Sequence, residues 1–172
     1  MNTSSIEKCL NNLLCGRDVP IYVIGANETS NISYDKLPLI VVQNTKSIPH
    51  KGQHWTAWIV WSREKADFFD SYGRGPEKYP EMIWPAVSVS QRNYNVVQGA
   101  TTYVCGEHCV FWSYNRIRGV SYKDIMRSYF KMTMYNDKMV VNFVNRIPNC
   151  HRHSLYYECK QVQTCMCRLD MM

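Results

Sequence analysis

Four residues of this chain, His54, Asp70, Gln98 and Cys105, have the types and the order that nucleophilic catalysis by a thiol requires. A cysteine is a good nucleophile as the thiolate, and a nearby imidazole favours that form. A carboxylate can fix the tautomer of the imidazole, and the amide of Gln98 can donate an N–H to a developing oxyanion. The set predicts a cysteine protease with the chain order His, Asp, Cys.

A β-hairpin is expected to hold the first two of these residues. Residues 54–61 and 66–69 are rich in aromatic and β-branched side chains, and the polar residues 62–65 between them form a turn. His54 and Asp70 then lie side by side at the open end of the hairpin, as a hydrogen bond between them requires.

Cys105 is expected at the first turn of a helix. Residues 105–118 form an apolar, helix-like segment that Gly119 ends. The positive end of the helix dipole lowers the pKa of a thiol at this position, which favours the reactive form of Cys105.

The other segments predict a single domain over residues 1–172 with an α+β fold, since the helices cluster after residue 104. The pattern predicts a helix over 5–14, strands over 21–24, 39–43 and 93–98, and a short helix near 80–84. A further helix begins at the Ser121 cap and runs through Phe130, and a last one is capped by Asn136 and stopped by Pro148.

Composition limits the class of protein. Hydrophobic residues make up 45% of the chain and charged residues 20%, as in ordinary globular proteins. No apolar run approaches the roughly 20 residues of a membrane helix, and residues 1–8 do not read as a secretory signal. We therefore expect an intracellular protein with reduced thiols and no membrane partner, and no disulfide framework among its eight cysteines.

The basic charge and the cysteine-rich tail leave alternatives open. The net charge of +6 permits nucleic acid as a partner, and also fits a mildly basic soluble protein. A phosphate-binding face or a solvated surface would each explain the cations Lys131, Lys138, Arg146, Arg152 and Arg168. The tail has ligand types for zinc but no finger spacing, so buried or free thiols are favoured over a metal site. These tail residues are Cys150, His151, His153, Cys159, Cys165 and Cys167.

Several short motifs occur together in a fixed order. They are Gly52-Gln53-His54-Trp55, Phe68-Phe69-Asp70-Ser71-Tyr72-Gly73, Val97-Gln98-Gly99 and Cys105-Gly106-Glu107-His108-Cys109. From about residue 10 to about residue 118 the chain resembles the adenovirus maturation proteases (adenains), in the superfamily that includes the SUMO-deconjugating proteases. Gln98 and Cys105 are seven positions apart, a spacing similar to the adenovirus type.

This resemblance implies a mixed β-sheet packed against helices, with the nucleophile at the N-terminus of a central helix. It makes Cys105 the nucleophile, His54 the general base and Asp70 the acid that orients His54. Gln98 and the backbone N–H of Cys105 become the oxyanion hole. Trp55 and Gly106 become substrate-binding residues in a narrow cleft that favours glycine.

The resemblance also implies a biological role. Family members cut structural precursors at Gly-Gly or Gly-x sites during virus particle maturation, in the host nucleus or cytoplasm and in the virion. We expect a monomer whose partners are protein substrates with such sites, with no required cofactor; an activating peptide or DNA is a further expectation. No cysteine lies between Asp70 and Gln98, so a covalent peptide activator at that position is not supported.

Two other functions stay open at this point. The same catalyst could act on SUMO- or ubiquitin-like conjugates, although the short chain and the Gln98–Cys105 spacing favour the adenovirus type. Alternatively, the chain could be a basic nucleic-acid-binding module with an inactive protease core, although all four catalytic positions are filled.

Overall fold

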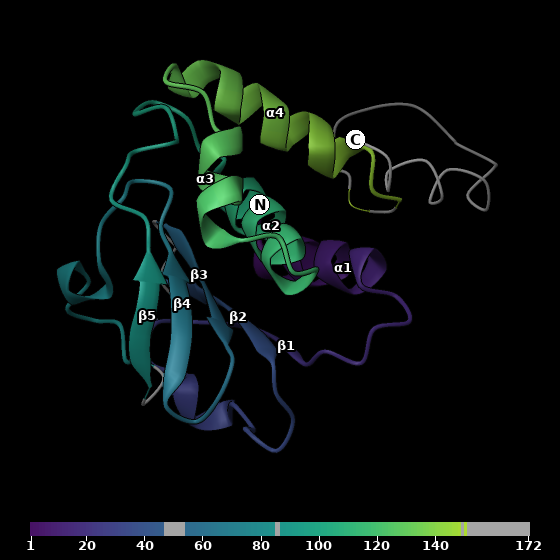
Figure 1. Cartoon of the computed structure of the whole chain (residues 1–172), viewed down its shortest axis with the longest axis vertical. Helices are drawn as coiled ribbons and strands as arrows, with labels where there is room; N and C mark the ends of the chain where they lie inside the picture. The colour runs from purple at the N-terminus through teal and green to yellow at the C-terminus, as the bar shows by residue number, and fades with distance from the viewer. Residues whose placement is uncertain (47–53, 85–86, 149, 151–172) are drawn as a thin grey trace.

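A five-stranded mixed β-sheet organises the described part of the chain, residues 1–46, 54–84, 87–148 and 150 of this computed structural model (Figure 1). The strands lie across the sheet in chain order: β1 (Ile21–Ile24), β2 (Leu39–Asn44), β3 (Trp55–Val60), β4 (Lys65–Phe69) and β5 (Ser88–Arg92). The pairs β1–β2 and β4–β5 are parallel, whereas β2–β3 and β3–β4 are antiparallel. The fold is therefore α+β, as the sequence predicts.

The central strand, β3, is covered on both faces. All six of its side chains are buried. Ala57 and Ile59 belong to one apolar cluster, and Trp58 and Val60 belong to a second. Because side chains alternate between the faces of a strand, the first cluster lies against the helices and the second lies on the opposite face. This double burial explains the unbroken apolar run in the sequence.

The α-helices gather on one side of the sheet (Figure 1). They are α1 (Thr3–Leu13), α2 (Cys105–Ile117), α3 (Tyr122–Ser128) and α4 (Thr133–Asn145). Two short 3₁₀ helices lie in connections between strands: η1 (Thr29–Asn31) follows β1, and η2 (Pro76–Lys78) follows β4. Helix α2 packs directly on β3, while α1 and α4 pack against α2. The start of α2 is thereby fixed beside the central strand.

Most predicted elements are present with small shifts of their ends. The strand over residues 21–24 is confirmed, and the hairpin arms are β3 and β4. The helix predicted over residues 5–14 begins two residues earlier, because the side chain of Asn2 caps it by accepting from the backbone N–H of Ser5. The Ser121 cap is also confirmed, since its hydroxyl accepts from the N–H of Asp124, but α3 ends at Ser128 rather than Phe130.

Three predicted elements are wrong. The strand expected over residues 93–98 lies earlier, at β5, because the side chain of Asn93 bonds the backbone of Asp70 and ends the sheet there. The short helix near 80–84 is absent from the described residues, and η2 forms upstream instead. Asn136 does not cap the last helix: α4 begins at Thr133, and the amide of Asn136 holds the carbonyl groups of Val97 and Phe130.

Two cysteines also depart from expectation. Cys9 of α1 and Cys150, beyond α4, form a disulfide, so the expectation of unpaired thiols is wrong for this pair. Both residues are buried in the helical layer, where the fold brings them together across 141 positions of sequence. Cys109 is a buried free thiol, as predicted, and Cys15 is an exposed one.

Candidate active site

A tight turn after β4 fixes the carboxylate of Asp70. The N–H of Gly73 donates to the Asp70 carbonyl at 2.8 Å, and Gly73 has a φ of +69°. A Cβ at position 73 would lie 2.6 Å from the carbonyl oxygen of Tyr94, so only glycine fits. The turn directs the backbone N–H groups of Tyr72 and Arg74 at the carboxylate, 2.8 and 3.1 Å away.

Asp70 is fully buried and its oxygens are well satisfied. The ring Nε2 of His54 donates to Oδ1 at 2.6 Å, and the hydroxyl of Tyr79 donates to Oδ2 at 2.6 Å. Burial acts to raise the pKa of this carboxyl, but the hydrogen bonds from His54, Tyr79 and Tyr72 outweigh it and lower the pKa below its usual range. Asp70 is therefore a carboxylate at neutral pH and holds the His54 ring in one orientation.

Cys105 is the first residue of α2. No side chain caps this helix at Val104, and Glu107 lies in its first turn. The first N–H groups of a helix have no partner within the helix, so the backbone N–H of Cys105 is positioned to bind an anion. The thiol itself is 9% exposed, next to the β3 strand on which α2 packs.

The His54 imidazole and the Cys105 thiol act on each other's ionisation, both through hydrogen bonding and through charge. Burial acts to lower the pKa of His54, but the hydrogen bonds and charges of Asp70 and Cys105 together raise it to about 9. Burial acts to raise the pKa of Cys105, but His54 and the backbone N–H of Trp55 lower it. The two shifts favour a thiolate–imidazolium pair at neutral pH.

The amide of Gln98 is oriented by its neighbours and is 1% exposed. The hydroxyl of Ser71 donates to Oε1 at 2.7 Å, which turns the Nε2 group the other way. There the amide donates to the carbonyl of Thr102 at 2.8 Å and to the hydroxyl of Tyr72 at 3.3 Å. In the free protein, both N–H directions of Gln98 therefore have acceptors.

Trp55 and Gly106, the predicted substrate-binding residues, are both buried. The indole N–H of Trp55 donates to the carbonyl of Met1 at 3.2 Å. A Cβ at position 106 would lie 3.0 Å from Cβ of Met1, so the beginning of the chain packs over both residues. Their role toward a substrate stays a prediction.

A second His–Asp pair, which the sequence did not single out, fixes the loop that carries Gln98. His108 of α2 donates from Nε2 to Asp137 of α4 at 2.9 Å. The same carboxylate accepts from the N–H of Gly99 at 3.1 Å and from the hydroxyl of Thr102 at 3.0 Å. Burial acts to raise the pKa of Asp137, but these hydrogen bonds lower it. The only indication of this pair in the sequence is that His108 lies one helical turn after Cys105.

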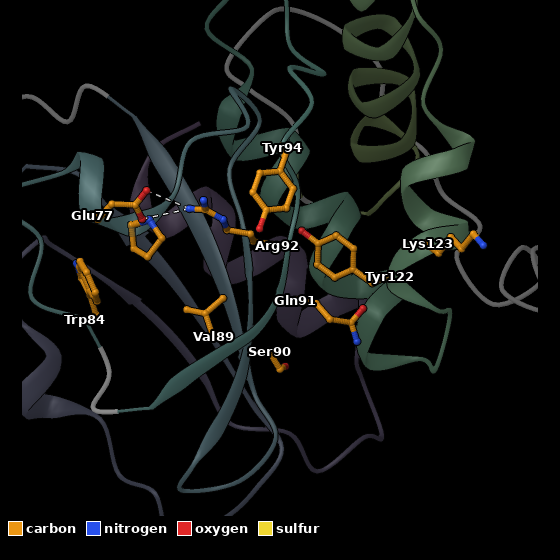
Figure 2. A pocket seen from close by; sticks show the side chains of 10 residues that line it. Glu77, Trp84, Val89, Ser90, Gln91, Arg92, Tyr94, Tyr122 and Lys123 are labelled. Carbon is orange, nitrogen blue, oxygen red and sulfur yellow. Dashed lines mark hydrogen bonds and ion pairs between the residues drawn. The ribbon is translucent and has the colours of Figure 1, made fainter.

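A shallow groove of about 510 Å³ lies along the outer strand β5 (Figure 2). An ion pair between Arg92 and Glu77 crosses one end, and Trp84 and Tyr94 are exposed at its margin. None of the groove-lining residues is a Cys, His or Asp. The groove therefore contains none of the thiol, imidazole or aspartate side chains that make up the candidate active site.

The remaining predicted features bear less on this site. Lys131, Lys138 and Arg146 are exposed. The other predicted residues lie outside the described part of the chain: Gly52, Gln53, His151, Arg152, His153, Cys159, Cys165, Cys167 and Arg168. Within the described ranges, no group of three or more His, Cys, Asp or Glu could hold a metal ion. Among the same residues, no helix has the length and apolar character needed to cross a membrane.

No protein-family model matches this sequence, and no curated protein matches it significantly.

Proposed function

We propose that this protein is a cysteine endopeptidase with Cys105 as nucleophile, His54 as general acid–base and Asp70 as the group that orients His54. The observation that carries the proposal is the buried hydrogen bond of 2.6 Å between His54 and Asp70, together with the interaction of the same imidazole with Cys105 at the start of α2. Perturbed pKa values in a buried pair of this kind are typical of functional sites. A purely structural ion pair would not require a thiol at a helix N-terminus.

The reaction follows from these positions. The Cys105 thiolate forms a C–S bond to the substrate carbonyl carbon, and the C=O π electrons move to the oxygen. The backbone N–H of Cys105 and the Gln98 amide stabilise that oxyanion. Collapse breaks the C–N bond, and the amine leaves with the proton of His54. Water then attacks the thioester, gives a proton to His54, and the thiolate leaves.

The substrate class rests on the resemblance to the adenain family. It supports protein substrates cut at Gly-Gly or Gly-x sites, structural precursors in a virus or virus-like element, and a single-domain monomer with an adenain-like fold. The described residues add one compatible feature: Trp55 lies directly after His54, and Met1 contacts the indole of Trp55 and lies next to Gly106. DNA or a peptide as activator is part of the same proposal.

The decisive experiment measures cleavage of short Gly-x-Gly peptides by the purified full chain. We expect Cys105→Ala and His54→Ala to abolish turnover, and Gln98→Ala to lower it by about 10²–10³-fold if its amide binds the oxyanion. Cys15→Ser is the matched control, because Cys15 is an exposed free thiol outside the site. Full activity of the Cys105→Ala protein, or no turnover by the unmodified chain on any Gly-containing peptide, would contradict the proposal.

A panel of full-length ubiquitin-like modifiers with C-terminal Gly-Gly aldehydes separates endopeptidase from deconjugating activity. Preference for the short peptides supports the proposal. Strong and selective labelling by one full-length modifier would instead assign the same catalyst to deconjugation.

A further inference from the structure

Tyr72 lies between the two halves of the candidate site. Its ring stacks on the imidazole of His54, with ring centroids 4.7 Å apart. Its hydroxyl lies at the other end, where it accepts from the amide of Gln98 at 3.3 Å. The charge of Cys105 also acts on this phenol. One side chain thus contacts both the base and the expected oxyanion donor.

The proton of this hydroxyl has no acceptor among the described residues. A phenol can accept and donate at the same time, and Tyr72 accepts from Gln98. Within the described ranges, its hydroxyl donates to no other group. Burial, followed by the charges of Cys105 and Asp70, raises the pKa of Tyr72, so the phenol keeps its proton at neutral pH.

The position of this free O–H matters because the Gln98 amide is already occupied. Its shorter bond, 2.8 Å, goes to the carbonyl of Thr102, and its longer one goes to Tyr72. Gln98 could serve an oxyanion directly only by giving up one of these bonds. Tyr72 needs no such rearrangement, and the bond that it accepts from Gln98 makes its own O–H a better donor.

We propose that Tyr72 is a further catalytic residue, whose O–H donates a hydrogen bond to the oxyanion formed when Cys105 attacks a carbonyl, beside the Gln98 amide that also bonds the phenol. This inference rests on the proposed function. No proton is transferred in the step: the oxyanion accepts one O–H bond as its charge develops and releases it when the C=O bond reforms.

The test compares two reactions of Cys105, of which only one passes through an oxyanion. Acylation by N-acetyl-Gly-Gly p-nitrophenyl ester forms a tetrahedral oxyanion, and the burst of p-nitrophenolate reports its rate. Alkylation by iodoacetamide is a direct displacement of iodide at carbon, so its rate depends on the fraction of Cys105 present as thiolate and involves no oxyanion. We expect Tyr72→Phe to slow acylation by about 10²-fold, as loss of one oxyanion donor does, and to leave alkylation within about twofold.

Two further proteins complete the design. Tyr94→Phe removes one phenol oxygen at a side chain that is 72% exposed, and should change neither rate. Incorporation of 3-fluorotyrosine at position 72 restores an O–H on the same ring and should restore acylation, even if the Tyr72→Phe protein folds poorly.

The outcomes are distinguishable. If Tyr72→Phe acylates as fast as the unmodified chain, Tyr72 is no oxyanion donor, whereas the cysteine hydrolase proposal stands. Equal losses in acylation and alkylation would overturn the inference too, because Tyr72 would then only position His54. Failure of 3-fluorotyrosine to restore acylation has the same consequence. If the unmodified chain alkylates but is not acylated by the ester, the proposed function fails and the role of Tyr72 fails with it.

Discussion

The ionisation of Cys105 depends on His54, and replacement of His54 by alanine tests this dependence directly. In the intact site, burial and the imidazole act on the thiol in opposite directions. His54→Ala removes the imidazole and its positive charge but leaves the other surroundings of a sulfur that is 9% exposed. The pKa of Cys105 should therefore rise from below the ordinary range to above it.

The size of the effect follows from the ionisation of an ordinary thiol. A thiol with a pKa of about 8.5 is ionised to about 0.3% at pH 6, roughly 300-fold below full ionisation. Burial without His54 takes Cys105 below that fraction, whereas His54 lowers the pKa of Cys105, and thiols paired in this way have pKa values of about 3.5–7.5. We expect the alkylation rate of Cys105 at about pH 6 to fall by about 10²-fold or more.

The assay is limited alkylation with iodoacetamide at about pH 6, followed by mass spectrometry of the digested chain to locate each modified cysteine. Cys15 is an internal control, because it is exposed and its alkylation should be the same in both proteins. The Cys105→Ala protein identifies the peptide that should lose its label. If Cys105 in the His54→Ala protein alkylates at the rate of the unmodified chain, His54 does not ionise the thiol and the argument for the ion pair is wrong.

Three further predictions concern the groups that support this pair. Asp70→Asn should lower the pKa of His54 from about 9, so the alkaline limb of kcat/KM on a Gly-x-Gly peptide should move to lower pH; an unchanged limb would contradict the assigned role of the carboxylate. Asp137→Ala should cost about 1–3 kcal/mol of unfolding free energy at neutral pH in urea titrations. The pKa of Asp137 is lower in the folded protein than in the unfolded chain. The difference in unfolding free energy between the two proteins should therefore shrink as the pH falls below about 3.9, and a difference that does not change with pH would contradict this role of the carboxylate. Asp67→Ala removes the carboxylate 2.8 Å from the half-buried Arg116 guanidinium and should cost about 1.5–3 kcal/mol; a loss below about 1 kcal/mol in the same titration would refute this.

The positions of His54, Asp70 and Cys105 within their hairpin and helix could be predicted from the sequence, because each depends on a short segment of chain. A hairpin with a four-residue polar turn has one register that buries its apolar side chains, and that register brings His54 to Asp70. The apolar, helix-like segment that begins at Cys105 and ends before Gly119 predicts α2 from local sequence alone. Both expectations depend only on neighbours within about 20 residues of each other.

The supports of the site could not be predicted in this way. Asn93, Tyr79 and Asp137 reach their partners across loops, and their types are common at turns and on surfaces. Asn93 has a strand-like sequence around it, yet its amide bonds the backbone of Asp70, and two such bonds outweigh a weak strand preference.

The order of residue types along the chain is enough to indicate a thiol, an imidazole and a carboxylate in one hairpin–helix arrangement. Which groups satisfy the buried polar atoms around them depends on how loops and helices far apart in the sequence pack, because each buried donor or acceptor takes whichever partner the packed chain brings within reach. For that reason the phenol of Tyr72, the His108–Asp137 pair and the Cys9–Cys150 bond became visible in three dimensions.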